Sequence, residues 1–113
     1  MRQSLFIALA FALAAAGATH AAPLSDTQTS VKVSDYGLDL SRPDDASQML
    51  RRLDVAAMEA CGADTSSLRE YRLVVRQSSC HAASLDRAVA ELNEPGVTAV
   101  YDRDRELANR STD

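Results

Sequence analysis

Two cysteines and a neighbouring histidine are the residues of this chain best suited to chemistry. Cys61 and Cys80 are its only cysteines, and His81 follows the second one directly. Such a set could form a structural disulfide, a redox-active pair or part of a metal site. Redox motifs place two cysteines in a Cys-x-x-Cys arrangement, and zinc needs four ligands at recognisable spacings, so neither pattern is met. We favour a structural disulfide without a cofactor or metal, beside which His81 is an ordinary surface or half-buried residue.

A structural disulfide requires an oxidising compartment, and the N-terminus indicates export. The first 21 residues have the layout of a secretory signal peptide, with a basic residue before an apolar run over residues 5–16. This run of about 12 residues is shorter than the roughly 20 that a membrane-spanning helix needs. Small residues favour cleavage between Ala21 and Ala22, with cleavage after Ala18 as the alternative. We therefore expect a periplasmic or secreted protein with no membrane span after signal removal.

The mature chain does not indicate an enzyme or a nucleic-acid-binding protein. Removal of the signal peptide leaves 11 basic and 16 acidic residues, a formal net charge of −5, which disfavours a phosphate backbone as partner. Arg69, Arg72 and Arg76 have the spacing of one helix face, and we interpret them as solvated and paired with neighbouring acids. One histidine remains, and no carboxylate pair stands out from the acids of helix surfaces. We therefore predict no catalytic residues.

A site for a small ligand or metal ion is the alternative from a different class. Asp35 and Asp39 flank Gly37 at a spacing that could hold a cation, although calcium loops use a longer run of oxygen ligands. Turn stabilisation and capping are the simpler roles for these aspartates. The alternative site would lie around Tyr36, Asp39 and His81.

Apolar spacing predicts two to three helices that form a disulfide-linked helical hairpin. Ser41 as N-cap and Pro43 in the first turn start the first helix, and Gly62 is placed to end it in a left-handed conformation. A second apolar stripe over residues 68–92 is interrupted at residues 78–79, which fits one kinked helix or two. The polar residues on the outer face of the first helix are Asp45, Gln48, Arg51, Arg52, Asp54 and Glu59.

Short β-prone segments flank the predicted helices. Residues 31–36 alternate at their start and are β-branched, which predicts an N-terminal strand. Residues 97–101 could pair with that strand or form a terminal helical turn. Residues 22–30 fit a flexible leader, and residues 102–113 fit a charged, disordered tail. The sequence thus predicts a mainly α (α+β) fold with one small domain over residues 31–101.

Four features of the chain occur in a characteristic order. They are the signal peptide, residues 31–43 (VKVSDYGLDLSRP), residues 60–62 (ACG), and the run over residues 80–101. Together they resemble the UrcA family of small exported bacterial proteins. The chain departs from the family pattern at residues 34–37, where Tyr-x-Asp is usual, and at residues 78–79, where basic residues are common. The family has no established activity, so the resemblance implies only export and the disulfide.

The expected function follows from export and size. We expect a periplasmic or secreted protein-interaction module of unknown biochemical activity, which presents a surface to an envelope or periplasmic protein. The binder of a small ligand or metal ion is the alternative, and an enzyme is the weakest hypothesis.

Overall fold

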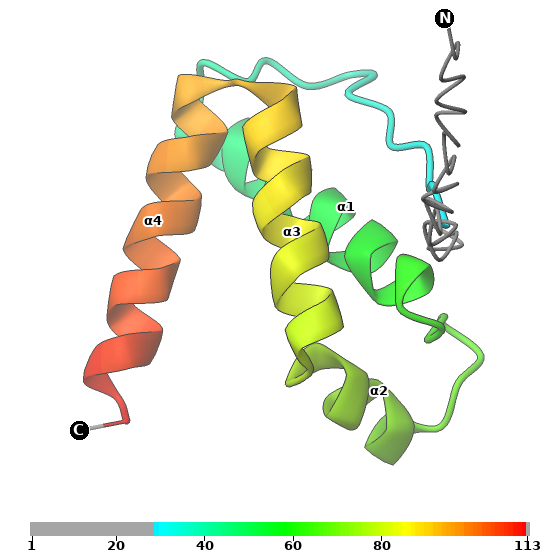
Figure 1. The fold of residues 1–113 in the computed structure, drawn as a ribbon. Helices are drawn as coiled ribbons and strands as arrows, with labels where there is room; N and C mark the ends of the chain where they lie inside the picture. Colours follow the sequence, from blue (N-terminus) through cyan, green and yellow to red (C-terminus); the bar gives the residue numbers. More distant parts are fainter. Residues whose placement is uncertain (1–28, 113) are drawn as a thin grey trace, which may run out of the picture.

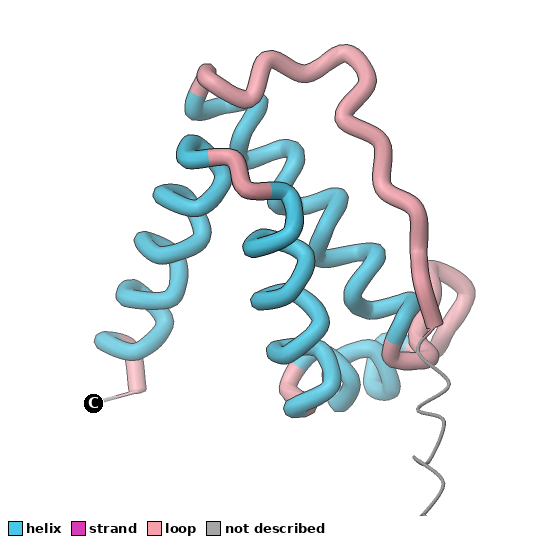
Figure 2. The backbone as a smooth tube through the Cα atoms, turned by 45° about the horizontal axis from the view of Figure 1, so that its top comes forward, coloured by secondary structure: helices cyan, strands magenta, loops and turns pink. Residues whose placement is uncertain are grey.

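The computed structural model describes residues 29–112, which form four helices and no strand. Figure 1 shows α3 and α4 as a hairpin that meets α1, with the short α2 beyond one end of α3. All other described residues are loop in Figure 2. The predicted signal peptide, with its cleavage site, lies outside the described residues. The mainly α fold is confirmed, and its helices are α1 (Pro43–Ala60), α2 (Arg69–Arg76), α3 (Ser79–Leu92) and α4 (Pro95–Arg110).

The core lies where α1 packs against α3 and α4, and it consists of aliphatic side chains. On α1 the buried residues recur every three or four positions and so share one face of the helix. Helix α3 contributes Val89, and α4 contributes Val97 and Val100. Met49 and Val97 are the largest side chains that are fully buried. The buried residues of α1 are Ala46, Met49, Leu50, Leu53, Ala57 and Met58.

The segment before α1 is extended, and the predicted strand over residues 31–36 is wrong. Val33, Leu38 and Leu40 pack against the core, so their apolar character reflects burial against helices. The proposed partner strand is also missing, because residues 97–101 belong to α4. A strand without a partner leaves its backbone groups unpaired, and β-propensity is easily overridden by tertiary packing.

Helix α4 also includes much of the segment that the sequence predicts as a disordered tail. The helix continues to Arg110, which corrects the prediction of a disordered tail for residues 102–110. Val97 and Val100 fix its first turns in the core, and the charged residues that follow form a solvated face. Glu106 and Arg110, four residues apart, approach to 3.7 Å, a spacing that supports a helix.

The start of α1 differs from the prediction in its capping residue. Arg42 is the N-cap and makes no side-chain capping bond, whereas Ser41 donates its hydroxyl to the Asp39 carboxylate at 2.6 Å. Hydrogen bonds from Ser41 lower the pKa of Asp39. The Asp45 carboxylate accepts the Asp39 amide at 2.9 Å. Ser41 therefore does not cap the helix, because a neighbouring carboxylate takes its hydroxyl.

The end of α1 confirms the role predicted for Gly62. Its φ of +90° places it in the left-handed region, where glycine is favoured. The Gly62 amide donates to the Glu59 carbonyl and the Ala63 amide donates to the Met58 carbonyl, each at 3.0 Å. This pair of bonds is a Schellman motif, which satisfies carbonyls at the end of the helix.

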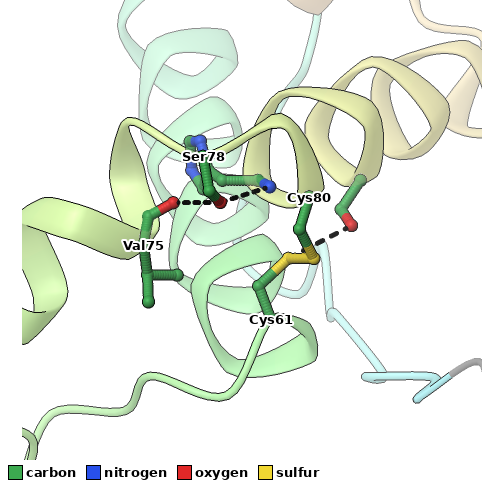
Figure 3. Close-up of a disulfide and its surroundings, with 6 residues drawn as sticks. Cys61, Val75, Ser78 and Cys80 are labelled. Carbon is green, nitrogen blue, oxygen red and sulfur yellow. Dashed lines mark hydrogen bonds between the residues drawn. A yellow bond between two sulfur atoms is a disulfide. The ribbon is translucent and has the colours of Figure 1, made fainter.

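The segment over residues 68–92 forms two helices, α2 and α3, so the alternative of one kinked helix is excluded. The Ser78 hydroxyl accepts the His81 amide at 3.2 Å and donates to the Val75 carbonyl at 2.6 Å (Figure 3). One side chain thus caps the start of α3 and satisfies a carbonyl near the end of α2. Serine competes in this way with the continuous backbone ladder.

Tyr101 links α4 to α3. Its hydroxyl donates to the Asp86 carboxylate, and Arg105 lies over its ring at 5.5 Å from the centroid. Burial, together with the hydrogen bond to Asp86 and the negative charge there, raises the pKa of Tyr101 to about 12.

We expect the Tyr101 contact to weaken at alkaline pH. The folded pKa of about 12 lies above the ordinary value of about 10, so folding favours the neutral hydroxyl. Its contribution to stability is complete below about pH 10 and is lost as the pH rises towards about 12. Denaturation of the wild type and Tyr101→Phe should therefore show free energies of unfolding that converge over this range. A difference that stays constant up to about pH 11.5 would contradict the assignment.

Gly96, in the first turn of α4, is required by a close approach of the chain to itself. A Cβ at this position would overlap the Leu40 carbonyl oxygen. We expect Gly96→Ala to lower the free energy of unfolding by about 1–3 kcal/mol. Helix propensity alone predicts the opposite sign, a gain of up to about 1 kcal/mol. Urea denaturation distinguishes the two, and a stabilised variant would show that the contact is unimportant.

Candidate functional site

The predicted disulfide joins the end of α1 to the first turn of α3. Cys61 and Cys80 are bonded, with Cα atoms 6.0 Å apart (Figure 3). The Cys61 sulfur also lies 3.6 Å from the Ser84 hydroxyl. The bridge encloses residues 62–79, a loop that contains the whole of α2. The segment that contains α2 therefore begins at the end of α1 and finishes at the start of α3, and the disulfide holds these two points together.

Packing holds α2 weakly in comparison. Val75 is the one buried residue among its eight, and it joins Met58 and Ala63 in a small cluster separate from the main core. A helix of this length is not stable by itself in water. The disulfide thus supplies much of the restraint that a larger apolar contact would otherwise provide.

His81 is buried, contrary to the surface or half-buried position expected for it. It is 7% exposed, and its Nε2 lies 2.9 Å from Oδ1 of Asp54 on α1. Asp54 also approaches Arg76 of α2 at 3.4 Å. The sequence pattern placed Asp54 on the outer face of α1, so it gave no signal for this pair. His81 and Asp54 link three helices and are engaged with each other.

The structure does not bring together the residues of the alternative ligand site. Tyr36 is 88% exposed. Asp39 lies at the start of α1, where it bonds to Ser41 and Asp45. His81 pairs with Asp54, nine residues beyond Asp45 and so about 13 Å further along α1. Within residues 29–112, no group of three or more His, Cys, Asp or Glu side chains is arranged to hold a metal ion.

Exposed apolar side chains gather instead on and beside α2. Leu68 is 76% exposed, Val74 65%, Leu73 54% and Tyr71 47%. Exposed apolar residues that occur together commonly mark an interaction surface, whereas scattered ones do not. Three arginines alternate with them, so charge and apolar area are combined. We call this the α2 surface, formed by Leu68, Arg69, Tyr71, Arg72, Leu73, Val74 and Arg76.

A pocket of about 420 Å³ lies between the α2 surface and α1. Met58 and Ala63 are buried beside it, and Val55 and Leu73 are more exposed. Its polar part contains three arginines and one carboxylate, that of Asp64. We call it the α1–α2 pocket, and its lining residues are Val55, Met58, Ala63, Asp64, Thr65, Arg69, Arg72, Leu73 and Arg76.

The arginines of the pocket are engaged to different extents. Arg72 donates to the Thr65 carbonyl at 3.0 Å, and Arg76 approaches Asp54. Arg69 has no hydrogen-bond or ion-pair partner among the residues that the structure describes. The Asp64 carboxylate accepts bonds from Ser66 and Ser67, and the bonds from Ser66 lower its pKa. The pocket is therefore positive. Arg69 and Arg76 are exposed, as the sequence suggested, but Arg76 is the only one of the three arginines that pairs with an acid among the described residues.

Two other hollows flank the extended segment before α1. One, of about 570 Å³, lies towards α1 and α3 and includes both Arg87 and Glu91. The other, of about 540 Å³, lies over the outer face of α1 and includes three basic residues, Lys32, Arg51 and Arg52, with the one acid Glu59. Both mix charges of opposite sign beside short apolar side chains. The α1–α2 pocket is distinguished by the exposed apolar side chains of α2 around it, whereas its excess of positive charge is shared with the hollow over the outer face of α1.

No family model, curated protein or solved structure matches this chain. The resemblance to the UrcA family therefore stays a prediction from the sequence. Within the described part of the chain, no helix is long and apolar enough to span a membrane.

Reduction of the disulfide is expected to release α2 before the other helices. A bridge that closes a loop of this length stabilises a protein by about 3 kcal/mol. After addition of a thiol reductant, the α2 amides should lose protection against hydrogen exchange, while core amides of α1 and α3 keep most of theirs. In a Cys61→Ala/Cys80→Ala control, the reductant should change nothing. Equal loss of protection in all helices would show that α2 does not depend specifically on the bridge.

Proposed function

We propose that the protein is an exported interaction module that binds an acidic segment of an envelope protein through the α2 surface. The observation that carries the proposal is the cluster of exposed apolar and arginine side chains on a helix with a single buried residue. The signal peptide predicted from the sequence and the disulfide support export into an oxidising compartment.

The composition of the α2 surface supports a protein partner. Leu73 and Val74 are more than half exposed, so burial against a partner would remove their apolar area from water, at about 25 cal/mol per Å². Tyrosine and arginine, both present on the surface, are enriched where protein interfaces concentrate their binding energy. A folded partner could thus gain affinity from a small contact area.

The charge of the α2 surface supports an acidic partner. Helix α2 carries three arginines and one glutamate, whereas the whole chain has a formal net charge of −4. Opposite charge guides association and disfavours wrong partners. An acidic partner would therefore be attracted to α2 and repelled by most of the remaining surface.

Photo-crosslinking in cells tests the proposed contact. A photoreactive residue at Val74 should give a discrete adduct with another exported protein, whereas the same residue at Leu107, an exposed apolar position on α4, should not. Excess unlabelled wild-type protein should compete for the adduct, and a Leu73→Asp/Val74→Asp variant with an unchanged melting temperature should not. Equal adducts from both positions, or no adduct from Val74, would contradict the proposal.

A further inference from the structure

We infer that the α1–α2 pocket receives one apolar side chain of an acidic amphipathic helix, whose carboxylates pair with Arg69 and Arg76. This inference rests on the proposed function and adds the chemical class of the partner segment. The partner motif has a central apolar residue. One Asp or Glu lies three positions from it on one side, and another Asp or Glu lies four positions from it on the other side.

The apolar part of the pocket explains the central residue of the motif. Met58 and Ala63 are buried against Val75 and form a firm base, while Val55 and Leu73 are 46% and 54% exposed. Its volume of about 420 Å³ falls in the range of cavities that bind ligands, roughly 300–1,000 Å³. A leucine or phenylalanine from a partner would contact all four residues.

The arginines set the spacing of the flanking acids. Arg69 lies four residues before Leu73 and Arg76 lies three residues after it, so the guanidiniums bracket the apolar rim along about 10 Å of helix axis. A partner helix could lie along α2 in a parallel or an antiparallel orientation. It would place one carboxylate near each of these two guanidiniums if its acids have the same spacing from its central apolar residue. Arg72 is held by the Thr65 carbonyl and is less free to move towards a partner.

The acids already near the pocket do not neutralise it. Asp64 accepts bonds from Ser66 and Ser67, and Asp54 pairs with His81 as well as with Arg76. Glu70, the one acid on α2, does not line the pocket. Three arginines thus face a single carboxylate in the lining, which leaves excess positive charge for incoming acids.

A second copy of this chain does not match the motif. Outside α2, its exposed large apolar side chains on helices are Val55 of α1 and Leu107 of α4. Neither has acids on both sides: the residues four and three positions before Val55 are Arg51 and Arg52, and those three and four positions after Leu107 are Arg110 and Ser111. Arginines from either helix would meet the arginines of the pocket. We therefore assign the partner segment to another protein.

Selection from a displayed library of random 15-residue peptides tests the motif without knowledge of the partner. The purified, oxidised protein is the bait, and enriched peptides are then synthesised and titrated by fluorescence anisotropy. We expect enrichment of peptides with an apolar residue flanked by acids at the inferred spacing. Arg69→Glu should weaken their binding about fivefold or more, as should replacement of the central apolar residue by alanine. Arg103→Glu on α4 is the matched charge control and should have no comparable effect.

The outcomes separate this inference from the proposed function. The Arg69 side chain is exposed and makes no hydrogen bond or ion pair with another described residue, so Arg69→Glu should leave the melting temperature unchanged and report binding alone. Enriched peptides without acids, or peptides equally sensitive to Arg103→Glu, would overturn the inference, as would failure of any peptide to bind. An adduct at Val74 in cells would still support the proposed function in each of these cases, and its absence would remove both proposals. Concentration-dependent dimerisation that is abolished by Arg69→Glu would instead identify a second copy as the occupant and overturn the assignment.

Discussion

The Cys61–Cys80 disulfide is the constraint on which the candidate surface depends. It fixes the ends of a segment that contains α2, a helix of eight residues with one buried side chain. Apolar burial normally keeps such a helix in place, and that requirement directs its apolar residues inward. Because a covalent bond supplies part of the restraint, Leu73 and Val74 can remain exposed. The bridge thus separates two tasks that usually compete for the same side chains, holding a helix and contacting a partner.

The helices outside the disulfide loop form an independent support. Ala, Leu, Val and Met residues of α1, α3 and α4 make one aliphatic core, and the Tyr101–Asp86 bond joins α3 to α4 away from α2. The pair formed by buried His81 and half-buried Asp54 connects α3 to α1 close to the bridge. A buried polar side chain such as that of His81 is costly without a hydrogen-bond partner, so its bond to Asp54 favours one relative position of the helices. The disulfide and the His81–Asp54 bond therefore both fix α1 against α3 at the end of the molecule where α2 lies.

The sequence predicted features that depend on local chemistry and missed those that depend on distant partners. The disulfide and the left-handed Gly62 follow from residue type and spacing. Residues 31–36 have the pattern of a strand, but a strand needs a pairing partner, and none exists among the described residues. His81 could not be placed because its burial depends on Asp54, 27 positions earlier. The α2 surface was missed for a related reason: three- and four-residue spacing identifies an apolar stripe but does not show whether another helix covers it.

The arginines explain how the α2 surface can expose apolar side chains and still be well hydrated. Eleven of the 12 basic residues of the chain are arginines. An arginine side chain can lie along apolar surface while its guanidinium stays in water, and its planar group pairs with carboxylates in two parallel bonds. On α2 this places charge around Leu73 without burying it, because Arg69 and Arg76 lie four residues before it and three residues after it, on the same side of the helix. An acidic partner would displace water from both kinds of group at once, and the excess of arginine over acid on α2 would attract it although the net charge of the chain is negative.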